Sequence, residues 1–192
     1  MNIIRPALHH VTMKTSRLSE MVAWYAVVVG AEVTFQDANN AWMTNDGANH
    51  RIAFLSVPGL ETHPDKVKHT GMHHSAFEYA SFADLMSSYE RIKGEGLTPA
   101  FALDHGLTTS LYYQDPEGNY VELQCDNFGD WALSSEFMRT SPDFKANPIG
   151  TFFDPERVSR AHASGRPFES LQPAVRAGEF VPDQVPNIGL PI

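Results

Sequence analysis

The sequence predicts an α+β fold built from two βαβββ modules, followed by an irregular C-terminal tail. The main observation is a repeat: residues 7–14 and residues 71–79 both have strand character, and both carry a pair of histidines. A helix pattern follows each run, at residues 16–21 and 81–86, with a similar order of polar and apolar positions. Because a repeat of this period spans one supersecondary unit, the two modules are expected to pack together around a core.

The first module, residues 5–58, reads as a strand, a helix and three further strands. Apolar residues recur at helical spacing from Leu18 onward, and Gly30 is placed to end that helix. Three strand-like runs separated by turns that contain asparagine follow, at residues 32–36, 41–44 and 51–57. This order defines the βαβββ unit.

The second module, residues 71–126, repeats the same order after a linker at residues 59–70. Its helix is expected at residues 81–95, and an Asp-Pro-Glu-Gly turn at residues 115–118 precedes its last strand. The expected strands after the helix lie near residues 98–103, 107–113 and 119–125. The two modules together form one predicted domain, residues 1–126.

The tail, residues 127–192, is rich in proline and glycine but also carries many aromatic side chains. A disordered segment would be poorer in such side chains. We therefore expect this C-terminal extension to pack on the domain, to contain a short helix at residues 155–164, and to bury apolar surface or line a pocket.

Composition excludes several classes of partner. The formal net charge of −9 gives no electrostatic reason to bind nucleic acid or an anionic membrane surface. No apolar run reaches the length of a membrane span, and no signal-peptide pattern is present. The single cysteine, Cys125, excludes an internal disulfide framework. These features predict a cytoplasmic protein that binds neither nucleic acid nor membrane.

Strand alternation places three polar side chains on the faces opposite the helix-packing residues: His10, His74 and Glu122. Two imidazoles and one carboxylate form the facial triad suited to non-haem Fe(II) or Mn(II), with coordination positions left free. Taken singly, each histidine reads more simply as a surface or hydrogen-bonded strand residue, but its recurrence in both modules favours a metal ligand. His9 and His73 are expected on the opposite faces, with an exchange of ligand inside either pair as the alternative.

The repeat, its histidines and the segment Tyr113–Glu122 (Tyr-Gln-Asp-Pro-Glu-Gly-Asn-Tyr-Val-Glu) resemble the vicinal oxygen chelate superfamily. More narrowly, residues 7–125 resemble the one-domain type I extradiol ring-cleavage dioxygenases, the class that opens catechol and dihydroxybiphenyl rings. The resemblance implies a curved mixed sheet that encloses the metal site. It also implies His10, His74 and Glu122 as ligands of a mononuclear Fe(II), with Mn(II) as the alternative ion.

Three more positions match the ring-cleaving members. His50 lies in a His-x-x-Ala-Phe pattern where they carry an acid–base histidine, and His105 lies at a His-Gly position before the penultimate strand. Tyr112 matches the tyrosine that contacts the bound diol. Without the resemblance, these residues would read as a turn histidine, a loop histidine and a sheet-packing tyrosine.

The resemblance implies extradiol cleavage of a catechol-type substrate with O2, in aromatic-compound degradation. The aromatic residues of the extension favour a bulky or bicyclic catechol, and exposed sheet edges favour a homo-oligomer. The alternatives are a non-redox metal enzyme of the same superfamily (a fosfomycin-type transferase or a glyoxalase-like isomerase) and a metal-free binding protein. A glyoxalase-like isomerase would need a carboxylate in the last strand of the first module, and Ile52–Val57 contains none.

Overall fold

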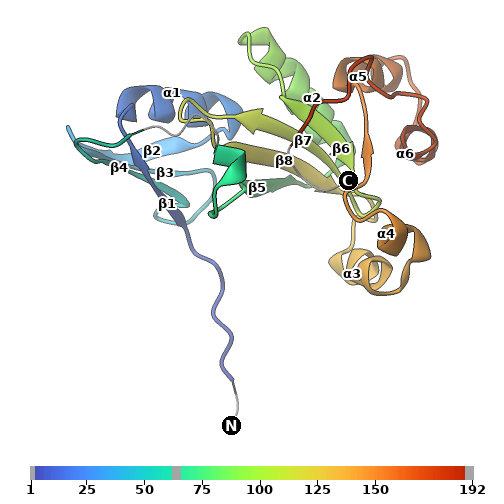
Figure 1. Ribbon diagram of the computed structural model, residues 1–192, viewed down its shortest axis with the longest axis horizontal. Helices are drawn as coiled ribbons and strands as arrows, with labels where there is room; N and C mark the ends of the chain where they lie inside the picture. Colours follow the sequence, from blue (N-terminus) through green and yellow to red (C-terminus); the bar gives the residue numbers. More distant parts are fainter. Residues whose placement is uncertain (1–2, 62–65, 189–192) are drawn as a thin grey trace. The chain divides into compact units, whose positions relative to one another are not determined.

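The computed structural model describes residues 3–61 and 66–188, so residues 62–65 of the predicted linker and residues 189–192 lie outside the described residues. The chain divides into two compact units, one formed by residues 1–64 with 115–118 and the other by residues 65–114 with 119–192. Each unit consists of an open sheet with helices against it (Figure 1). The fold is therefore α+β, as predicted.

The first unit is a four-stranded sheet with the strand order β1-β4-β3-β2. Its strands are β1 (Val11–Thr15), β2 (Glu32–Gln36), β3 (Asn40–Thr44) and β4 (Ile52–Ser56). Strand β1 runs parallel to β4, and the other neighbours are antiparallel. Helix α1 (Leu18–Val28) covers one face of this sheet and buries Met21, Tyr25 and Val28 completely. The other face of the sheet remains available for polar chemistry.

The β7–β8 turn, residues 115–118, belongs to the first unit. The hydroxyl of Tyr25 donates to Oδ2 of Asp115 at 3.2 Å. Oε1 of Glu117 accepts from Oγ1 of Thr15 at 2.7 Å, at the junction between β1 and α1. The Asp-Pro-Glu-Gly sequence therefore anchors this turn through its side chains in addition to shaping its backbone.

The second unit is a five-stranded sheet with the order β5-β8-β7-β6-β9. Its strands are β5 (His74–Tyr79), β6 (Phe101–Asp104), β7 (Thr108–Gln114), β8 (Tyr120–Asp126) and β9 (Thr151–Phe152). A 3-10 turn, η1 (Lys66–Lys68), precedes them. Helix α2 (Phe82–Gly94) is capped by Ser81, whose side chain accepts from the backbone N–H of Asp84. Apolar residues at helical spacing along α2 are buried: Leu85, Met86, Tyr89 and Ile92.

The C-terminal extension is more regular than the sequence suggests. It contains β9 and four helices: α3 (Trp131–Thr140), α4 (Pro142–Ala146), α5 (Pro155–Ala163) and α6 (Phe168–Arg176). Two of the prolines that suggested an irregular chain are the first residues of α4 and α5, where a missing N–H costs nothing. The helix expected at residues 155–164 is α5, so that prediction is confirmed.

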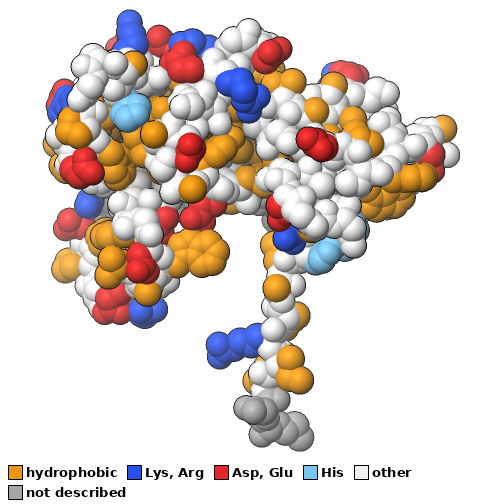
Figure 2. Space-filling model, turned by 180° about the vertical axis from the view of Figure 1, so that it is seen from behind, with side chains coloured by type: hydrophobic (Ala, Val, Ile, Leu, Met, Phe, Trp, Pro, Cys, Tyr) orange, Lys and Arg blue, Asp and Glu red, His pale blue; other side chains and the backbone are white. Residues whose placement is uncertain are grey.

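The extension packs on the sheet of the second unit. Strand β9 pairs antiparallel with β6, with Leu103 opposite Phe152 and Asp104 opposite Thr151. Helix α3 is tied to β5, because Nε1 of Trp131 donates to the carboxylate of Glu78 at 2.9 Å. Apolar side chains nevertheless remain exposed on the lobe of α3 and α4, at the lower left in Figure 2. No helix in the described part of the chain is both long and apolar enough to span a membrane.

Candidate active site

Strands β5, β7 and β8 bring a group of polar side chains together on one face of the second unit. The register places Ala76 of β5 and Tyr112 of β7 on either side of Glu122 in β8. Val121 and Leu123, the neighbours of Glu122 along β8, are buried on the opposite face. Strand alternation therefore fixes Glu122 on the face that the sequence predicted.

Glu122 is a buried carboxylate, only 5% exposed, at the centre of this group. Its Oε2 lies 3.0 Å from Nε2 of His74, and its Oε1 accepts a hydrogen bond from the hydroxyl of Tyr112 at 2.9 Å. Burial alone would raise the pKa of this carboxyl group, but hydrogen bonds from His74, Ser110 and Tyr112 outweigh it and lower the pKa. Glu122 is therefore ionised at neutral pH.

Tyr112 and His105 extend the group toward β6. Nε2 of His105 lies 2.9 Å from the hydroxyl of Tyr112, and the ring of Phe101 stacks on the tyrosine at 4.4 Å between centroids. Burial, followed by the charge of Glu122, raises the pKa of Tyr112 far above its ordinary value. Burial also lowers the pKa of His105, against the opposing charges of Glu122 and Asp104. At neutral pH the pair is therefore a protonated phenol beside a neutral imidazole.

His74 uses both ring nitrogens. While Nε2 faces Glu122, Nδ1 lies 2.8 Å from Nδ1 of His73. The ring of His73 stacks on Tyr120, and its Nε2 is a buried atom without a hydrogen-bond partner among the described residues. The prediction that His73 lies on the far face is wrong, because its ring contacts His74 and stacks on Tyr120, the residue opposite His74 in the sheet. Strand alternation does not extend to His73, since β5 begins only at His74.

The first unit gathers a second group of histidines. Its strand β1 begins at Val11, so His9 and His10 precede it, and the prediction of opposite faces is wrong for this pair as well. Their Nδ1 atoms lie 3.0 Å apart, and the ring centroid of His50 is 4.3 Å from that of His10. One ring nitrogen from each of the three residues can be chosen so that all lie within 4.8 Å of one another.

His50 lies two residues before β4. Its Nδ1 is 2.6 Å from Oδ1 of Asn49. Partial desolvation lowers the pKa of His50, and the neighbouring His10 and His9 lower it further. The imidazole is therefore neutral at neutral pH.

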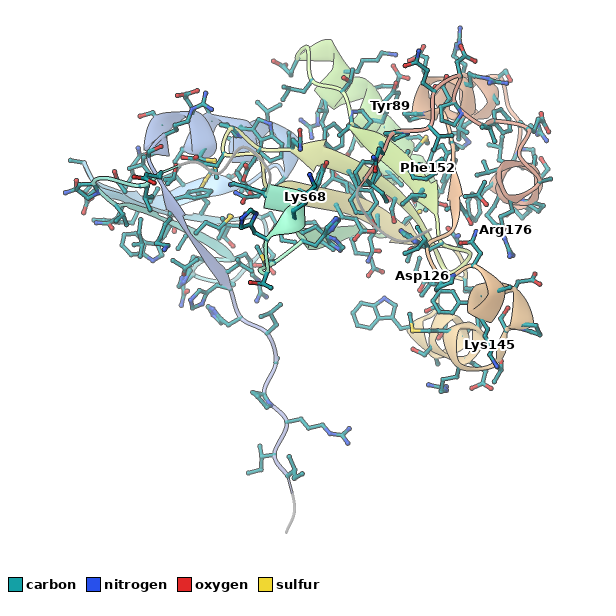
Figure 3. All side chains as sticks on the ribbon, in the orientation of Figure 1. Lys68, Tyr89, Asp126, Lys145, Phe152 and Arg176 are labelled. Atoms are coloured by element: carbon teal, nitrogen blue, oxygen red, sulfur yellow. The ribbon has the colours of Figure 1, made fainter. Side chains whose placement is uncertain are left out.

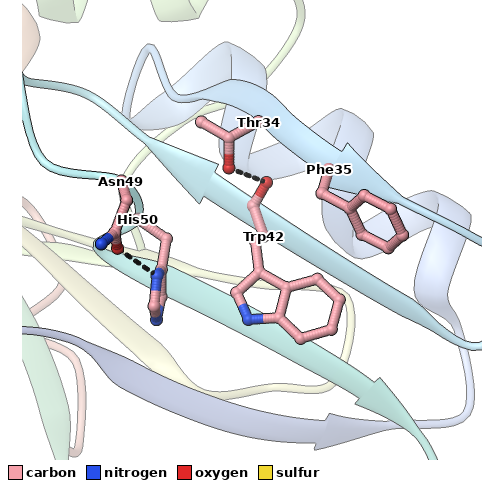
Figure 4. A pocket seen from close by; sticks show the side chains of 5 residues that line it. All are labelled: Thr34, Phe35, Trp42, Asn49 and His50. Atoms are coloured by element: carbon pink, nitrogen blue, oxygen red, sulfur yellow. Dashed lines mark hydrogen bonds between the residues drawn. The ribbon is translucent and has the colours of Figure 1, made fainter.

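An open cleft of about 490 Å³ adjoins His50 in the first unit. Its lining residues come from β2, β3 and the loop before β4: Thr34, Phe35, Trp42, Asn49 and His50. Figure 4 shows the rings of Phe35 and Trp42 side by side on the face of the sheet that points away from α1, at 5.4 Å between centroids. Sequence reasoning missed both aromatic residues; Trp42 could have been found from its alternation with the buried residues Ala41 and Met43, whereas Phe35 lies in a strand that is exposed throughout.

The structure thus groups the predicted residues within each unit. His10 and His50 lie together in the first unit. His74, His105, Tyr112 and Glu122 lie together in the second, and they contact one another directly.

Comparison with known proteins places the chain among relatives of known class. Residues 7–123 match the family model described as the glyoxalase/bleomycin resistance protein/dioxygenase superfamily. Biphenyl-2,3-diol 1,2-dioxygenase 2 of Rhodococcus globerulus is 39% identical over 183 residues, covering 95% of this chain and 94% of the relative. Biphenyl-2,3-diol 1,2-dioxygenase 3 of the same organism is 35% identical over 169 residues, covering 88% of each.

Solved structures agree on the fold. A glyoxalase/bleomycin resistance protein/dioxygenase from Nocardioides aligns with a TM-score of 0.51 at 19% identity, covering 65% of this chain and 86% of the other. A glyoxalase/dioxygenase from Nostoc punctiforme aligns with a TM-score of 0.51 at 18% identity, covering 66% of this chain and 97% of the other. The chain belongs to the glyoxalase/bleomycin resistance protein/dioxygenase superfamily, and within it to the dioxygenases that the two Rhodococcus relatives represent.

Proposed function

We propose that the protein cleaves the ring of a catechol-type diol next to its hydroxyl groups, consuming O2 and using a mononuclear Fe(II). The observation that carries this proposal is the buried carboxylate of Glu122, which faces His74 and Tyr112 across a network of short polar contacts. Burial of a charge is costly unless the charge has a partner, and a metal ion is a common one. The near-full-length relatives, both biphenyl-2,3-diol 1,2-dioxygenases by name, support the reaction class.

His74 and Glu122 fit a shared metal ion. An imidazole nitrogen and a carboxylate oxygen that face each other at short distance could both bind one such ion. Nε2 of His74 and Oε2 of Glu122 are 3.0 Å apart. The Nδ1 contact of His74 with His73 matches the habit of metal-bound imidazoles to hydrogen-bond through their second nitrogen.

His10 is the proposed third ligand. Fe(II) is the proposed ion, and Mn(II) would suit the same two imidazoles and one carboxylate. When bound, the ion would supply a Lewis acid that lowers the pKa of the diol and a redox centre for O2.

Tyr112 and His105 are proposed to bind the diol through hydrogen bonds. The phenol stays protonated at neutral pH, so its hydroxyl is a donor. That hydroxyl donates to Glu122 at 2.9 Å in the absence of substrate, and rotation about its C–O bond would redirect the same hydrogen to a substrate oxygen. His105 lies on the other side of the hydroxyl and fixes its position.

His50 is the proposed acid–base residue. The oxygen of the Asn49 amide only accepts hydrogen bonds, so its contact with Nδ1 of His50 assigns the ring proton to Nδ1. Nε2 then carries the lone pair. A neutral imidazole in this form can take a proton from the diol at Nε2 and return it at a later step.

The aromatic cleft beside His50 supports a bicyclic substrate. Phe35 and Trp42 offer two ring faces within a space of about 490 Å³, which lies in the range of small-molecule sites. A second aryl ring on the diol would pack against these two side chains.

The oligomeric state and the cellular compartment complete the proposal. Exposed apolar side chains on α3 (Trp131, Leu133 and Met138) support a homo-oligomer. The buried single cysteine, Cys125, supports a reducing cytoplasm.

Oxygen uptake tests the reaction. The protein is loaded anaerobically with Fe(II) and mixed with 2,3-dihydroxybiphenyl, and air is then admitted while oxygen consumption and a yellow ring-fission product are followed. One O2 consumed per product formed, abolished in His74→Ala, supports extradiol cleavage. Bound metal without oxygen uptake across a panel of catechols would favour a non-redox transferase or isomerase. Absence of metal binding would favour a binding protein.

A further inference from the structure

The Asp104-His105-Gly106 segment at the end of β6 is surrounded by the C-terminal extension. Strand β9 pairs with the end of β6, so Thr151 lies opposite Asp104. The elements involved can be followed in Figure 3, where Phe152 marks β9 and Arg176 marks the end of α6. A Cβ atom at Gly106 would lie 3.0 Å from the ring of Phe137 on α3, so the extension contacts the residues on both sides of His105.

The carboxylate of Asp104 fixes the turn that follows it. Asp104 is only 2% exposed and accepts from the backbone N–H of Gly106 at 2.8 Å. It also accepts from Oγ1 of Thr109, from Nδ2 of Asn127 and from Nε2 of Gln172, each at 3.2 Å. Gln172 lies on α6, so this helix is joined to the residue directly before His105.

Gly150 allows the extension to reach the backbone of His105. Its φ is +96°, and a Cβ atom at this position would lie 2.1 Å from the carbonyl oxygen of Asp104 and 2.9 Å from Cα of His105. Backbone atoms cannot move aside as a flexible side chain can. Only glycine permits this approach.

The imidazole of His105 is held on both sides. Its Nε2 lies 2.9 Å from the hydroxyl of Tyr112, and its ring also hydrogen-bonds to the backbone of Ile149, a contact that favours the protonated ring. These two contacts hold the ring of His105 in one position between Tyr112 and the C-terminal extension.

We infer that the C-terminal extension is a positioning element for His105. Through Ile149, Gly150 and Gln172 it sets the location of an imidazole that contacts the substrate-binding hydroxyl of Tyr112. This inference rests on the proposed function for the role of Tyr112 and His105 in turnover. It explains why a βαβββ pair would carry some sixty additional residues packed against β6.

The first test is Gly150→Ala, with Gly165→Ala as its matched control. Gly165 has a φ of +95°, so alanine meets the same backbone strain there, but a Cβ at Gly165 has no neighbour within 4 Å among the described residues. Nitrogen chemical shifts of the His105 ring, recorded without metal or substrate, report the hydrogen bonds of its two nitrogens. We expect Gly150→Ala to change these shifts and Gly165→Ala to leave them unchanged.

Kinetics of the iron-loaded protein give the second readout. We expect Gly150→Ala to lower kcat by about 10- to 100-fold, as small misplacements of catalytic groups do, with bound iron and KM unchanged. Gly165→Ala is expected to keep the wild-type kcat. Unchanged His105 shifts in Gly150→Ala, or changed shifts with an unchanged kcat, would overturn the inference.

Gln172→Leu provides an independent variant if Gly150→Ala does not fold. It removes the donor from α6 to Asp104, and Gln184→Leu, at an exposed position of the same extension, is its control. We expect only Gln172→Leu to move the His105 signals and lower kcat; equal behaviour of the two variants would contradict the inference. A wild-type protein that cleaves no diol would contradict the proposed function, while the His105 chemical shifts would still decide the positioning role.

Discussion

Replacing Tyr112 by phenylalanine removes one oxygen from the centre of the candidate site and leaves the packing intact. The lost hydroxyl donates to Oε1 of Glu122 at 2.9 Å and contacts Nε2 of His105 at 2.9 Å. The ring, which is only 4% exposed, keeps its stacking on Phe101. Because a hydrogen bond to a charged group contributes about 1.5–3 kcal/mol, we expect the free energy of unfolding to fall by about 2 kcal/mol.

Such a loss corresponds to a decrease in Tm of about 4–8 °C for a chain of this size. Removal of a hydrogen-bond donor to reacting oxygens lowers kcat by about 100-fold in other enzymes, and we expect a similar loss here. Thermal unfolding and oxygen-uptake kinetics, measured on the same preparation, give both numbers.

The neighbouring residue supplies the control. Tyr113 is 1% exposed and lies on the opposite face of β7, and its hydroxyl has no hydrogen-bond partner among the described residues. Tyr113→Phe removes an unsatisfied buried polar group, so we expect wild-type kcat and equal or slightly higher stability. If Tyr112→Phe behaves like wild type, or Tyr113→Phe is the more damaging change, the assigned hydrogen-bond network is incorrect.

Three further predictions use other parts of the chain. His50→Ala is expected to keep the metal but to lose about 100-fold or more in kcat, as removal of an acid–base group does; equal loss of metal in this variant would refute its role. Burial raises the pKa of Cys125 to about 12, so the native thiol should not react with a thiol reagent at pH 8 and should react fully in urea; rapid native labelling would contradict this burial. Hydrogen bonds from Lys93 and Tyr89 lower the pKa of Glu156. The ionised carboxylate therefore stabilises the folded protein at pH values above its unfolded pKa of about 4.3. This stabilisation is lost as the pH falls through the pKa of Glu156 in the folded protein. Glu156→Gln should therefore reduce stability in urea at pH 7 by less than about 1 kcal/mol, and the difference from wild type should shrink as the pH falls below the unfolded pKa; a difference independent of pH would rule out the ion pair as its origin.

The order of elements could be predicted because it depends on local periodicity. Apolar positions at helical spacing in α1 and α2, and alternation in β7 and β8, are local properties of the sequence. The face occupied by Glu122 followed from the same alternation, since it lies well inside β8. His9 and His73 were misplaced because each precedes the first residue of its strand, where the period of two no longer applies.

Long-range contacts could not be predicted in this way. The cleft of Phe35 and Trp42 depends on the pairing of β2 with β3, and the two residues read in sequence as ordinary strand positions. The support of His105 by Gly150 and Gln172 joins residues that are far apart along the chain. A glycine-rich and proline-rich segment gives no local sign that one glycine meets a distant backbone.

The fate of molecular oxygen tests the central claim most directly. The iron-loaded protein is given 2,3-dihydroxybiphenyl under ¹⁸O2, and the product is trapped rapidly and analysed by mass spectrometry. We predict a product opened beside the two hydroxyl groups that carries both atoms of one O2 molecule, and no such product from His74→Ala. A ring that remains intact, or a product without ¹⁸O from a protein with iron bound, would contradict the account.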